Sequence, residues 1–314
     1  MSGFVTIEDL KVHYPIRSGF FNRVTDHVYA VDGVSLEIEE GKTYGLVGES
    51  GSGKSTIGKS IIGLEHVTSG KVIYEGQDVT NKARRRTSDY NRNVQMIFQD
   101  SLSSFNPKKR ILDIVAEPLR NFERLSPDEE RKRVIELMEI IGLSEEALLK
   151  YPHQFSGGQR QGIGVARALA SNPRLIIADE PVSALDLSVQ AQVLNYMKRI
   201  QDEFNLSYLF ISHDLGVVKH MCDELFIMYR GRFVETGKSE DIYANPQHIY
   251  TKRLLSAIPV IDPENREANK LRRKEAEKFY QENQKLYYDE NGRVFDLQKI
   301  SDSHFVALNP KGGK

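Results

Sequence analysis

Residues 48–56 read GESGSGKST, which fits the phosphate-binding pattern G-x-x-x-x-G-K-[ST]. The apolar run 43–47 leads directly into this segment, and Ile57, Ile61 and Ile62 follow it at helical spacing. Strand, glycine-rich loop and helix in this order are the context that the pattern requires. The segment therefore predicts a site for a nucleotide triphosphate, and it disfavours a chance glycine-rich turn.

The loop is expected to act through its backbone and through two side chains. Backbone N–H groups cradle phosphate oxygens, the helix dipole adds to the attraction, and glycines let the backbone approach closely. Lys54 would reach the β- and γ-phosphates, and Ser55 would offer its hydroxyl to Mg²⁺. The nucleotide-binding residues expected in this segment are Gly48, Ser50, Gly51, Gly53, Lys54, Ser55 and Thr56.

The composition of the chain excludes several classes of protein. Its 314 residues include 43 Lys and Arg and 44 Asp and Glu, so no overall field favours nucleic acid or an anionic membrane. No apolar run approaches the ~20 residues that span a bilayer, and the N-terminus lacks a signal-peptide layout. The single cysteine, Cys222, excludes an internal disulfide and a cysteine metal cluster. We expect a soluble cytosolic protein with no nucleic-acid partner, whose basic run 82–86 is a solvated loop.

A second motif places two carboxylates at the end of an apolar strand, where Asp179 and Glu180 follow the run 175–178. Alternation along a strand points neighbouring side chains to opposite sides, so the two acids can share a task only if the backbone turns there. The carboxyl ends of parallel strands are the expected place for chemistry in an open α/β sheet. Taken alone, the dipeptide is equally compatible with a strand end that carries two solvated acids.

A third motif, Ser156-Gly157-Gly158-Gln159, precedes a helical pattern that contains Gly164, Ala166 and Ala168. A serine and small residues at a helix start form an anion site by the same physics as the phosphate loop. One chain with two such helix starts could hold two phosphates. A capped surface helix is the alternative for this motif alone.

The three motifs in this order resemble ABC-type ATPases, for which Ser-Gly-Gly-Gln is the signature. Stretches 99–107, 151–154, 245–251 and 254–259 narrow the resemblance to the oligopeptide/dipeptide importers. The length of the chain and its Tyr14-Pro15 opening are similar to the F-type ATPase of that group. The resemblance covers about residues 4–263.

The resemblance implies three catalytic residues and a magnesium site. Glu180 would polarise the attacking water, His213 would contact the γ-phosphate, and Gln99 would sense Mg²⁺ and the water. Asp179 would hold Mg²⁺ through water, so the metal set is Ser55, Gln99 and Asp179. Taken alone, Gln99 and His213 would be a polar strand-end residue and a satisfied loop histidine.

The resemblance also implies that ATP is shared between two subunits. Ser156, Gly157, Gly158 and Gln159 would bind the ATP of the opposing subunit, and the segment that ends at Asp186 would cross to that partner. Hydrolysis would then depend on dimerisation. Tyr14 would stack on adenine, in competition with three other aromatic residues, Phe20, Phe21 and Tyr29.

Two residues depart from the family pattern. Ile249 stands where relatives usually carry proline, and Gly162 stands where they usually carry a basic residue. Glycine should lower helix stability there by about 1 kcal/mol against a good helix former. We also expect that a charged surface contact is missing at Gly162.

The expected fold is an α/β, P-loop NTPase core of the ABC type, with an N-terminal antiparallel β layer, a helical subdomain and a C-terminal appendage. The ABC ATPase domain would span residues 1–263, with the helical subdomain inserted at about 103–165. A capping pattern at Ser126 and a stop at Gly142 bound one of its helices. Residues 264–314 would form the C-terminal extension, with a hairpin turn at Asn291-Gly292.

The expected function is ATP hydrolysis that powers oligopeptide or dipeptide import, exercised at the cytoplasmic face of the membrane. The implied partners are a second ABC ATPase subunit, two transmembrane permease subunits and, indirectly, an extracytoplasmic peptide-binding protein. A heterodimer of ATPases is favoured over a homodimer. The alternatives are an importer ATPase for nickel, glutathione or an opine, and a soluble ABC ATPase of translation or DNA repair.

Overall fold

The structure is a computed structural model that describes residues 3–18, 22–86, 89–100, 103–258 and 266–310. The chain divides into two compact units. We name them the helical unit, residues 1–5, 38–42 and 74–211, and the phosphate-loop unit, residues 6–37, 43–73 and 212–314. Within the described ranges, no helix combines the length and the apolar character that a bilayer crossing requires.

Three parallel strands form the sheet of the helical unit. They are β6 (Val94–Ile97), β7 (Leu175–Asp179) and β8 (Ser207–Ser212), and β7 lies between the other two. All five residues of β7 are buried, which agrees with its unbroken apolar run because a central parallel strand is covered on both faces. The other elements are β5 (Gln77–Asp78), α2 (Lys82–Arg86), α3 (Tyr90–Asn93), α4 (Ile111–Phe122), α5 (Pro127–Ile140), α6 (Gly157–Leu169), α7 (Leu187–Phe204) and two 3-10 turns (Glu145–Leu149, Pro152–Gln154). The expectation of a solvated loop at 82–86 is wrong, because this run forms α2 and Arg85 within it is buried.

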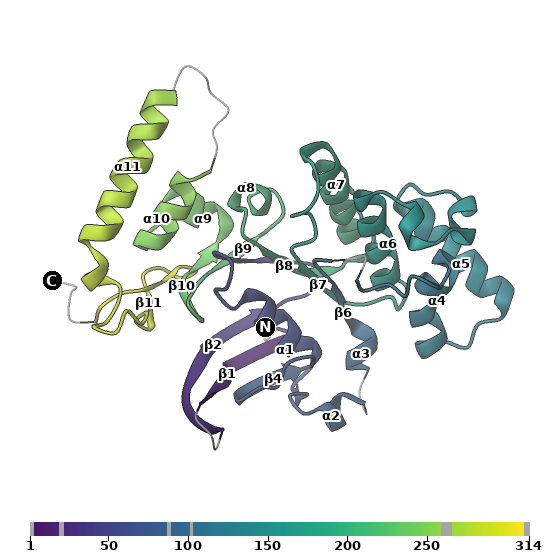
Figure 1. Cartoon of the computed structure of the whole chain (residues 1–314), viewed down its shortest axis with the longest axis horizontal. Helices are drawn as coiled ribbons and strands as arrows, with labels where there is room; N and C mark the ends of the chain where they lie inside the picture. The colour runs from purple at the N-terminus through teal and green to yellow at the C-terminus, as the bar shows by residue number, and fades with distance from the viewer. Residues whose placement is uncertain (1–2, 19–21, 87–88, 101–102, 259–265, 311–314) are drawn as a thin grey trace. The chain divides into compact units, whose positions relative to one another are not determined.

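The helices α4, α5 and α6 pack against one another (Figure 1) and occupy most of the segment expected to be a helical insertion. Helix α5 begins at the predicted capping box, in which the Ser126 N–H donates a 2.8 Å hydrogen bond to Glu129 Oε2. Gly142 follows the helix with a φ of 76°, a conformation that glycine adopts without steric cost. The predicted start and stop of this helix are therefore confirmed.

The expectation that a charged surface contact is missing at Gly162 is wrong. Gly162 is buried in α6, and a Cβ at this position would lie 3.3 Å from Tyr196 Oη and 3.4 Å from Ile141 Cδ1. The face of α6 that carries Gly162 packs against α7 and the end of α5, so no charged surface contact is missing here.

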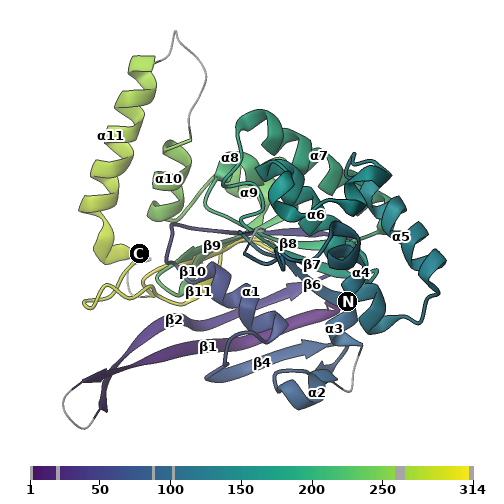
Figure 2. The ribbon, with the colours of Figure 1, turned by 45° about the vertical axis from the view of Figure 1, so that its right-hand side comes forward.

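The phosphate-loop unit contains two groups of strands. Strands β2 (Arg23–Ile38), β1 (Val5–Ser18) and β4 (Ser69–Tyr74) lie in that order in the expected antiparallel N-terminal layer (Figure 2). The second group has the order β11 (Leu297–Lys299), β12 (Phe305–Ala307), β10 (Arg232–Lys238), β9 (Glu224–Tyr229) and β3 (Thr43–Val47). Only the β3–β9 pair in this described group is parallel. The helices are α1 (Lys54–Ile62), α8 (Leu215–Val218), α9 (Ser239–Ala244), α10 (Ile249–Ser256) and α11 (Arg266–Glu282), with a 3-10 turn at Gln284–Leu286.

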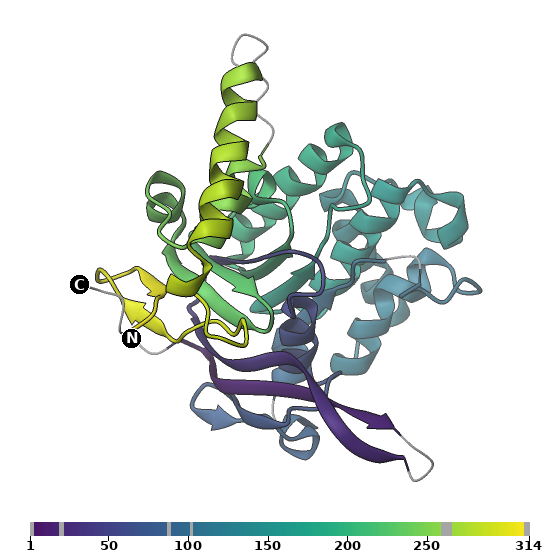
Figure 3. The ribbon, with the colours of Figure 1, turned by 60° about the vertical axis from the view of Figure 1, so that its left-hand side comes forward.

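The described part of the expected C-terminal extension adds strands to the second group (Figure 3). Strand β12 pairs with β10, and His304, just before it, places Nε2 2.7 Å from Glu235 Oε1. Glu235 is fully buried, and its carboxylate also accepts the N–H groups of Gln247 and His248 at the start of α10. The expected boundary at 263/264 lies outside the described residues. The predicted turn at Asn291-Gly292 is confirmed, since Gly292 has a φ of 72° and Tyr288 pairs with Val294.

His248, the buried N-cap residue of α10, should make the protein less stable in acid. Burial of the imidazole, aided by the Lys252 charge, lowers the pKa of His248 to about 3. Its unfolded value is ~6.5, so the unfolded chain binds more protons between these values, and stability falls as the pH drops below ~6.5. We expect the Tm of the wild type to fall more between pH 7.5 and 5.5 than that of His248→Asn, which keeps a capping acceptor. Equal losses in calorimetry would contradict this role of His248.

Candidate functional site

The phosphate loop has a backbone that leaves no room for side chains at two of its glycines. A Cβ on Gly48 would lie 2.2 Å from the Met228 carbonyl oxygen, and one on Gly53 would lie 2.1 Å from that of Ala30. Gly53 is also the N-cap of α1, with a φ of 108° and no side chain to cap the first turn. Phosphate oxygens can therefore accept hydrogen bonds from the start of α1, as the sequence predicts.

Lys54 is the buried cation of this loop, with only 4% of its surface exposed. Its Nζ donates hydrogen bonds to the carbonyl oxygens of Gly48 at 2.7 Å and Glu49 at 2.8 Å, and to Ser52 Oγ at 3.3 Å. The ammonium is therefore fixed within the loop that it is expected to serve. Ser55 and Thr56 follow it in the first turn of α1.

Tyr14 lies beside the same helix and keeps 40% of its surface exposed. Its hydroxyl donates a 2.8 Å hydrogen bond to Glu65 Oε2 and also contacts Thr56. Partial burial and the Glu65 carboxylate raise the pKa of Tyr14. Tyr29 is also exposed and packs its ring on His13, whereas Phe20 and Phe21 lie outside the described residues. Tyr14 thus contacts the first turn of α1 through Thr56, and its role as the stacking ring stays a prediction.

The backbone turns at the two carboxylates, as a shared task requires. Asp179 is the last residue of β7 and is buried, whereas Glu180 has a φ of 47° and is half-buried. The Glu180 N–H donates to the Ile211 carbonyl oxygen at 2.9 Å, which holds the turn against β8. A non-glycine residue with positive φ costs about 1–3 kcal/mol and is concentrated at functional sites.

Gln99 and Glu180, far apart in the sequence, meet in the helical unit. Gln99 Nε2 donates a 2.8 Å hydrogen bond to Glu180 Oε2. Both residues line a pocket of about 200 Å³ together with Gly157 of the signature and Leu185. Two predicted catalytic side chains and the signature therefore share one pocket.

The signature serine and glutamine form a capping box at the start of α6. Gln159 N–H donates to Ser156 Oγ at 3.3 Å, and Ser156 N–H donates to Gln159 Oε1 at 3.0 Å. The capped helix that the sequence offered as an alternative is thus present. It does not exclude anion binding, because a serine oxygen that accepts one bond keeps its own hydroxyl proton to donate.

Asp186 and His213 are both exposed. Asp186 caps α7, and its Oδ1 accepts hydrogen bonds from Val189 N–H at 3.0 Å and Ser188 Oγ at 2.7 Å. The bond from Ser188 is the main reason that the pKa of Asp186 is lowered. Leu187 beside it is 82% exposed, as a segment that contacts another subunit would require. His213 lies between β8 and α8 in the phosphate-loop unit.

The fold and these motifs define an ATP-binding cassette. Residues 31–183 match the family described as "ABC transporter", and residues 234–289 match "Oligopeptide/dipeptide transporter, C-terminal region". The solved structure of a dimeric ATP-binding cassette in a post-hydrolysis state, bound to ADP and Pi, is similar to this chain, with a TM-score of 0.66. The two sequences are 28% identical, and the match covers 75% of this chain and 98% of that chain. The structure of cbiO1 from Clostridium perfringens, 24% identical, has the same fold with a TM-score of 0.67 over 81% of this chain and 96% of that one.

Relatives of similar length narrow the class. The oligopeptide transport ATP-binding protein OppF of Lactococcus lactis subsp. lactis is 60% identical over 100% of this chain and 98% of its own. OppF of Bacillus subtilis is 46% identical over 96% and 94%, and the dipeptide transport ATP-binding protein DppF of Haemophilus influenzae is 49% identical over 83% and 80%. The chain belongs to the ABC transporter family, among the ATP-binding proteins of oligopeptide and dipeptide transport.

These matches confirm the predicted fold and the predicted branch of the family. They also extend the resemblance beyond residue 263, since the C-terminal family match reaches residue 289 and the OppF match covers all 314 residues. The sequence motifs do not point to Tyr250 and Arg253 of α10, which contact Glu49 of the phosphate loop. Their spacing of three places them on one face of a helix, but nothing local indicates what that face contacts.

Proposed function

We propose that this chain is the ATP-hydrolysing subunit of an importer for oligopeptides or dipeptides. The identity of 60% to OppF over the full chain carries the proposal, and the match of residues 234–289 to the oligopeptide/dipeptide C-terminal region supports it. Other cargoes, such as nickel, glutathione or an opine, have no support among these relatives. A soluble ABC ATPase of translation or DNA repair has none either.

In the proposed reaction, the phosphate loop binds ATP through Lys54 and the start of α1, and Tyr14 stacks on the adenine. Glu180 orients and polarises the attacking water, and Gln99 holds the Glu180 carboxylate in place through their hydrogen bond. His213 contacts the γ-phosphate. Phosphoryl transfer then depends mainly on positioning and on stabilisation of charge.

The proposed metal residues suit magnesium by the chemistry of their donor atoms. Ser55, Gln99 and Asp179 offer a hydroxyl, an amide and a carboxylate oxygen, and hard cations such as Mg²⁺ prefer oxygen ligands. When bound, the ion would neutralise the charge that develops on the phosphates. Asp179 is suited to the task because it is buried at the end of a rigid strand.

The proposed assembly pairs two ATPase subunits at the cytoplasmic face of the membrane, together with two permease subunits and an extracytoplasmic peptide-binding protein. The exposed signature serine and the exposed segment around Asp186 are available for an opposing subunit. Each ATP would be held by the phosphate loop of one subunit and the signature of the other. A different ATPase is favoured as the partner, and affinity purification from detergent-solubilised membranes identifies it.

Uptake of labelled peptides tests the proposed cargo. A strain that lacks this chain should lose import of labelled di- to pentapeptides, and the wild-type chain should restore it. The Glu180→Gln variant should not restore it, whereas uptake of a free amino acid should be unaffected in every strain. Intact peptide uptake with a loss of nickel, glutathione or opine uptake would overturn the proposed cargo.

A further inference from the structure

Glu49, the second residue of the phosphate loop, contacts α10 through both its backbone and its side chain. Its N–H donates a 2.9 Å hydrogen bond to Tyr250 Oη, and its Oε1 lies 3.4 Å from Arg253 Nη2. Its carbonyl oxygen accepts the 2.8 Å hydrogen bond from Lys54 Nζ. One residue of the loop therefore connects the ammonium expected to bind phosphate with the C-terminal element.

Arg253 is itself held by the tail helix α11, which packs beside α10 (Figures 1 and 2). Arg253 Nε lies 3.1 Å from Glu277 Oε2, and its guanidinium carbon lies 4.8 Å from the centre of the Tyr280 ring. A planar guanidinium that pairs with a carboxylate and stacks on an aromatic ring is well oriented. Helix α11 thus orients the charge that Arg253 brings to Glu49.

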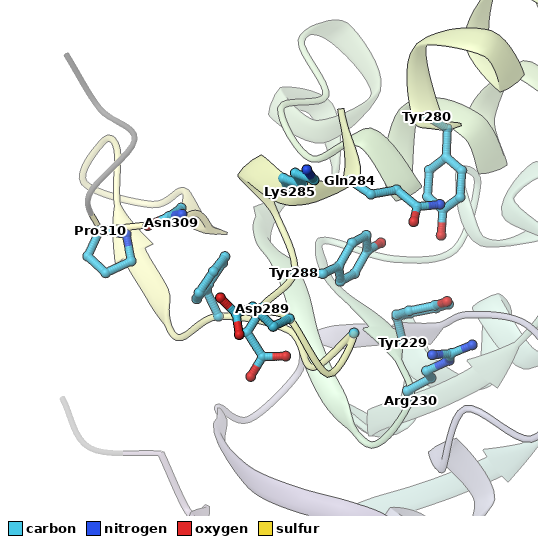
Figure 4. A pocket seen from close by; sticks show the side chains of 12 residues that line it. Tyr229, Arg230, Tyr280, Gln284, Lys285, Tyr288, Asp289, Asn309 and Pro310 are labelled. Atoms are coloured by element: carbon cyan, nitrogen blue, oxygen red, sulfur yellow. The ribbon is translucent and has the colours of Figure 1, made fainter. Parts of the chain in front are cut away.

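Tyr250 is held by a group of tyrosines that includes Tyr229 and Tyr288. It is fully buried, and its ring lies 4.7 Å from that of Tyr229, which in turn lies 5.4 Å from that of Tyr288. Tyr229, Tyr280 and Tyr288 line a pocket of about 790 Å³ (Figure 4). Because aromatic packing fixes the Tyr250 ring, its hydroxyl is pre-placed to accept the N–H of the phosphate loop.

Arg253 places a positive charge beside the negative charge of Glu49. A carboxylate in a phosphate loop repels the negative ligand that the loop is expected to bind, and a guanidinium at 3.4 Å offsets this repulsion. The Glu49 side chain is 48% exposed and that of Arg253 is 33% exposed, so solvent weakens this electrostatic compensation without abolishing it.

We propose that Tyr250 and Arg253, held in place by α11, are positioning residues that set the affinity of the phosphate loop for nucleotide. The inference rests on the proposed function, because it takes the loop as the ATP site. It assigns a role in nucleotide binding to the C-terminal element and the tail.

Binding of methylanthraniloyl-ADP with Mg²⁺, followed by fluorescence, tests the proposal on the full chain. Arg253→Gln should raise the Kd about three- to five-fold because Glu49 is left unpaired, and Glu49→Gln in the same chain should restore the affinity. Tyr250→Phe should raise the Kd about three- to ten-fold because the Glu49 N–H loses its acceptor. In steady-state assays of the assembled transporter, the KM for ATP should rise while kcat stays within about two-fold. This is the result expected when the lost interactions stabilise the bound substrate and the transition state about equally.

Lys252→Gln is the matched control, since Lys252 lies next to Arg253 and contacts α11 through the Phe279 ring at 5.7 Å. It should bind nucleotide like the wild type. If Arg253→Gln and Tyr250→Phe also bind like the wild type, with their Tm unchanged, the positioning role is overturned while the proposed function stands. If Glu49→Gln fails to restore Arg253→Gln, the charge argument is overturned. A wild-type chain that binds no nucleotide overturns the proposed function itself.

Discussion

Glu180→Gln is expected to lower the ATP turnover of the assembled transporter by ~10²–10⁴-fold while nucleotide binding persists. Glutamine keeps the shape of the side chain and an oxygen that can accept the hydrogen bond from Gln99 Nε2. It removes the negative charge that polarises the attacking water. Phosphate release measures turnover, and binding of a fluorescent nucleotide measures affinity.

Glu203→Gln is the matched control for this variant, because Glu203 is an exposed glutamate on α7 of the same unit. Its turnover should equal that of the wild type. Wild-type turnover in Glu180→Gln would remove Glu180 from the catalytic set. In that case the left-handed turn at this residue would need another explanation.

Lys54→Ala is expected to lower turnover by at least ~10²-fold and, unlike Glu180→Gln, to weaken nucleotide binding as well. The substitution removes a buried charge that we propose binds phosphate. It also removes three hydrogen bonds that hold the carbonyl oxygens of Gly48 and Glu49 and the hydroxyl of Ser52 in the loop. The loss of the charge and the loss of the hydrogen bonds both weaken the binding of ATP, which precedes the chemical step.

Lys59→Ala controls for the loss of a lysine from the same helix, since Lys59 lies in the last turn of α1. It should retain nucleotide binding, and circular dichroism should show the same fold in both variants. Nucleotide binding by Lys54→Ala at wild-type affinity would contradict the role of the phosphate loop.

The features that could be predicted from the sequence are those set by residues a few positions apart. The strand, loop and helix around Lys54, the capping box at Ser126 and the turn at Gly292 all depend on near neighbours in the chain. The order of the motifs also indicates the ABC class without reference to any tertiary contact. The requirement for a turn at Glu180 followed from strand geometry alone.

The features that could not be predicted depend on what a helix face or a strand edge contacts. The sequence suggests a missing surface contact at Gly162 because it does not indicate which face of α6 meets Tyr196. The contact of Glu235 with His304 joins residues 69 positions apart, and the contact of Glu49 with Tyr250 spans 201. Such pairs depend on the completed fold, which local propensity and periodicity do not describe.

The pairing of β12 with β10 protects an edge of the sheet. Without the tail, β10 would pair only with β9 and would present a row of unsatisfied backbone groups to solvent, which is a template for aggregation. With the tail in place, the outermost strand is β11, which has only three residues and ends at Lys299. A short edge strand that carries a lysine discourages pairing with other chains. The C-terminal segment therefore helps to keep this ATPase from associating with itself through its sheet.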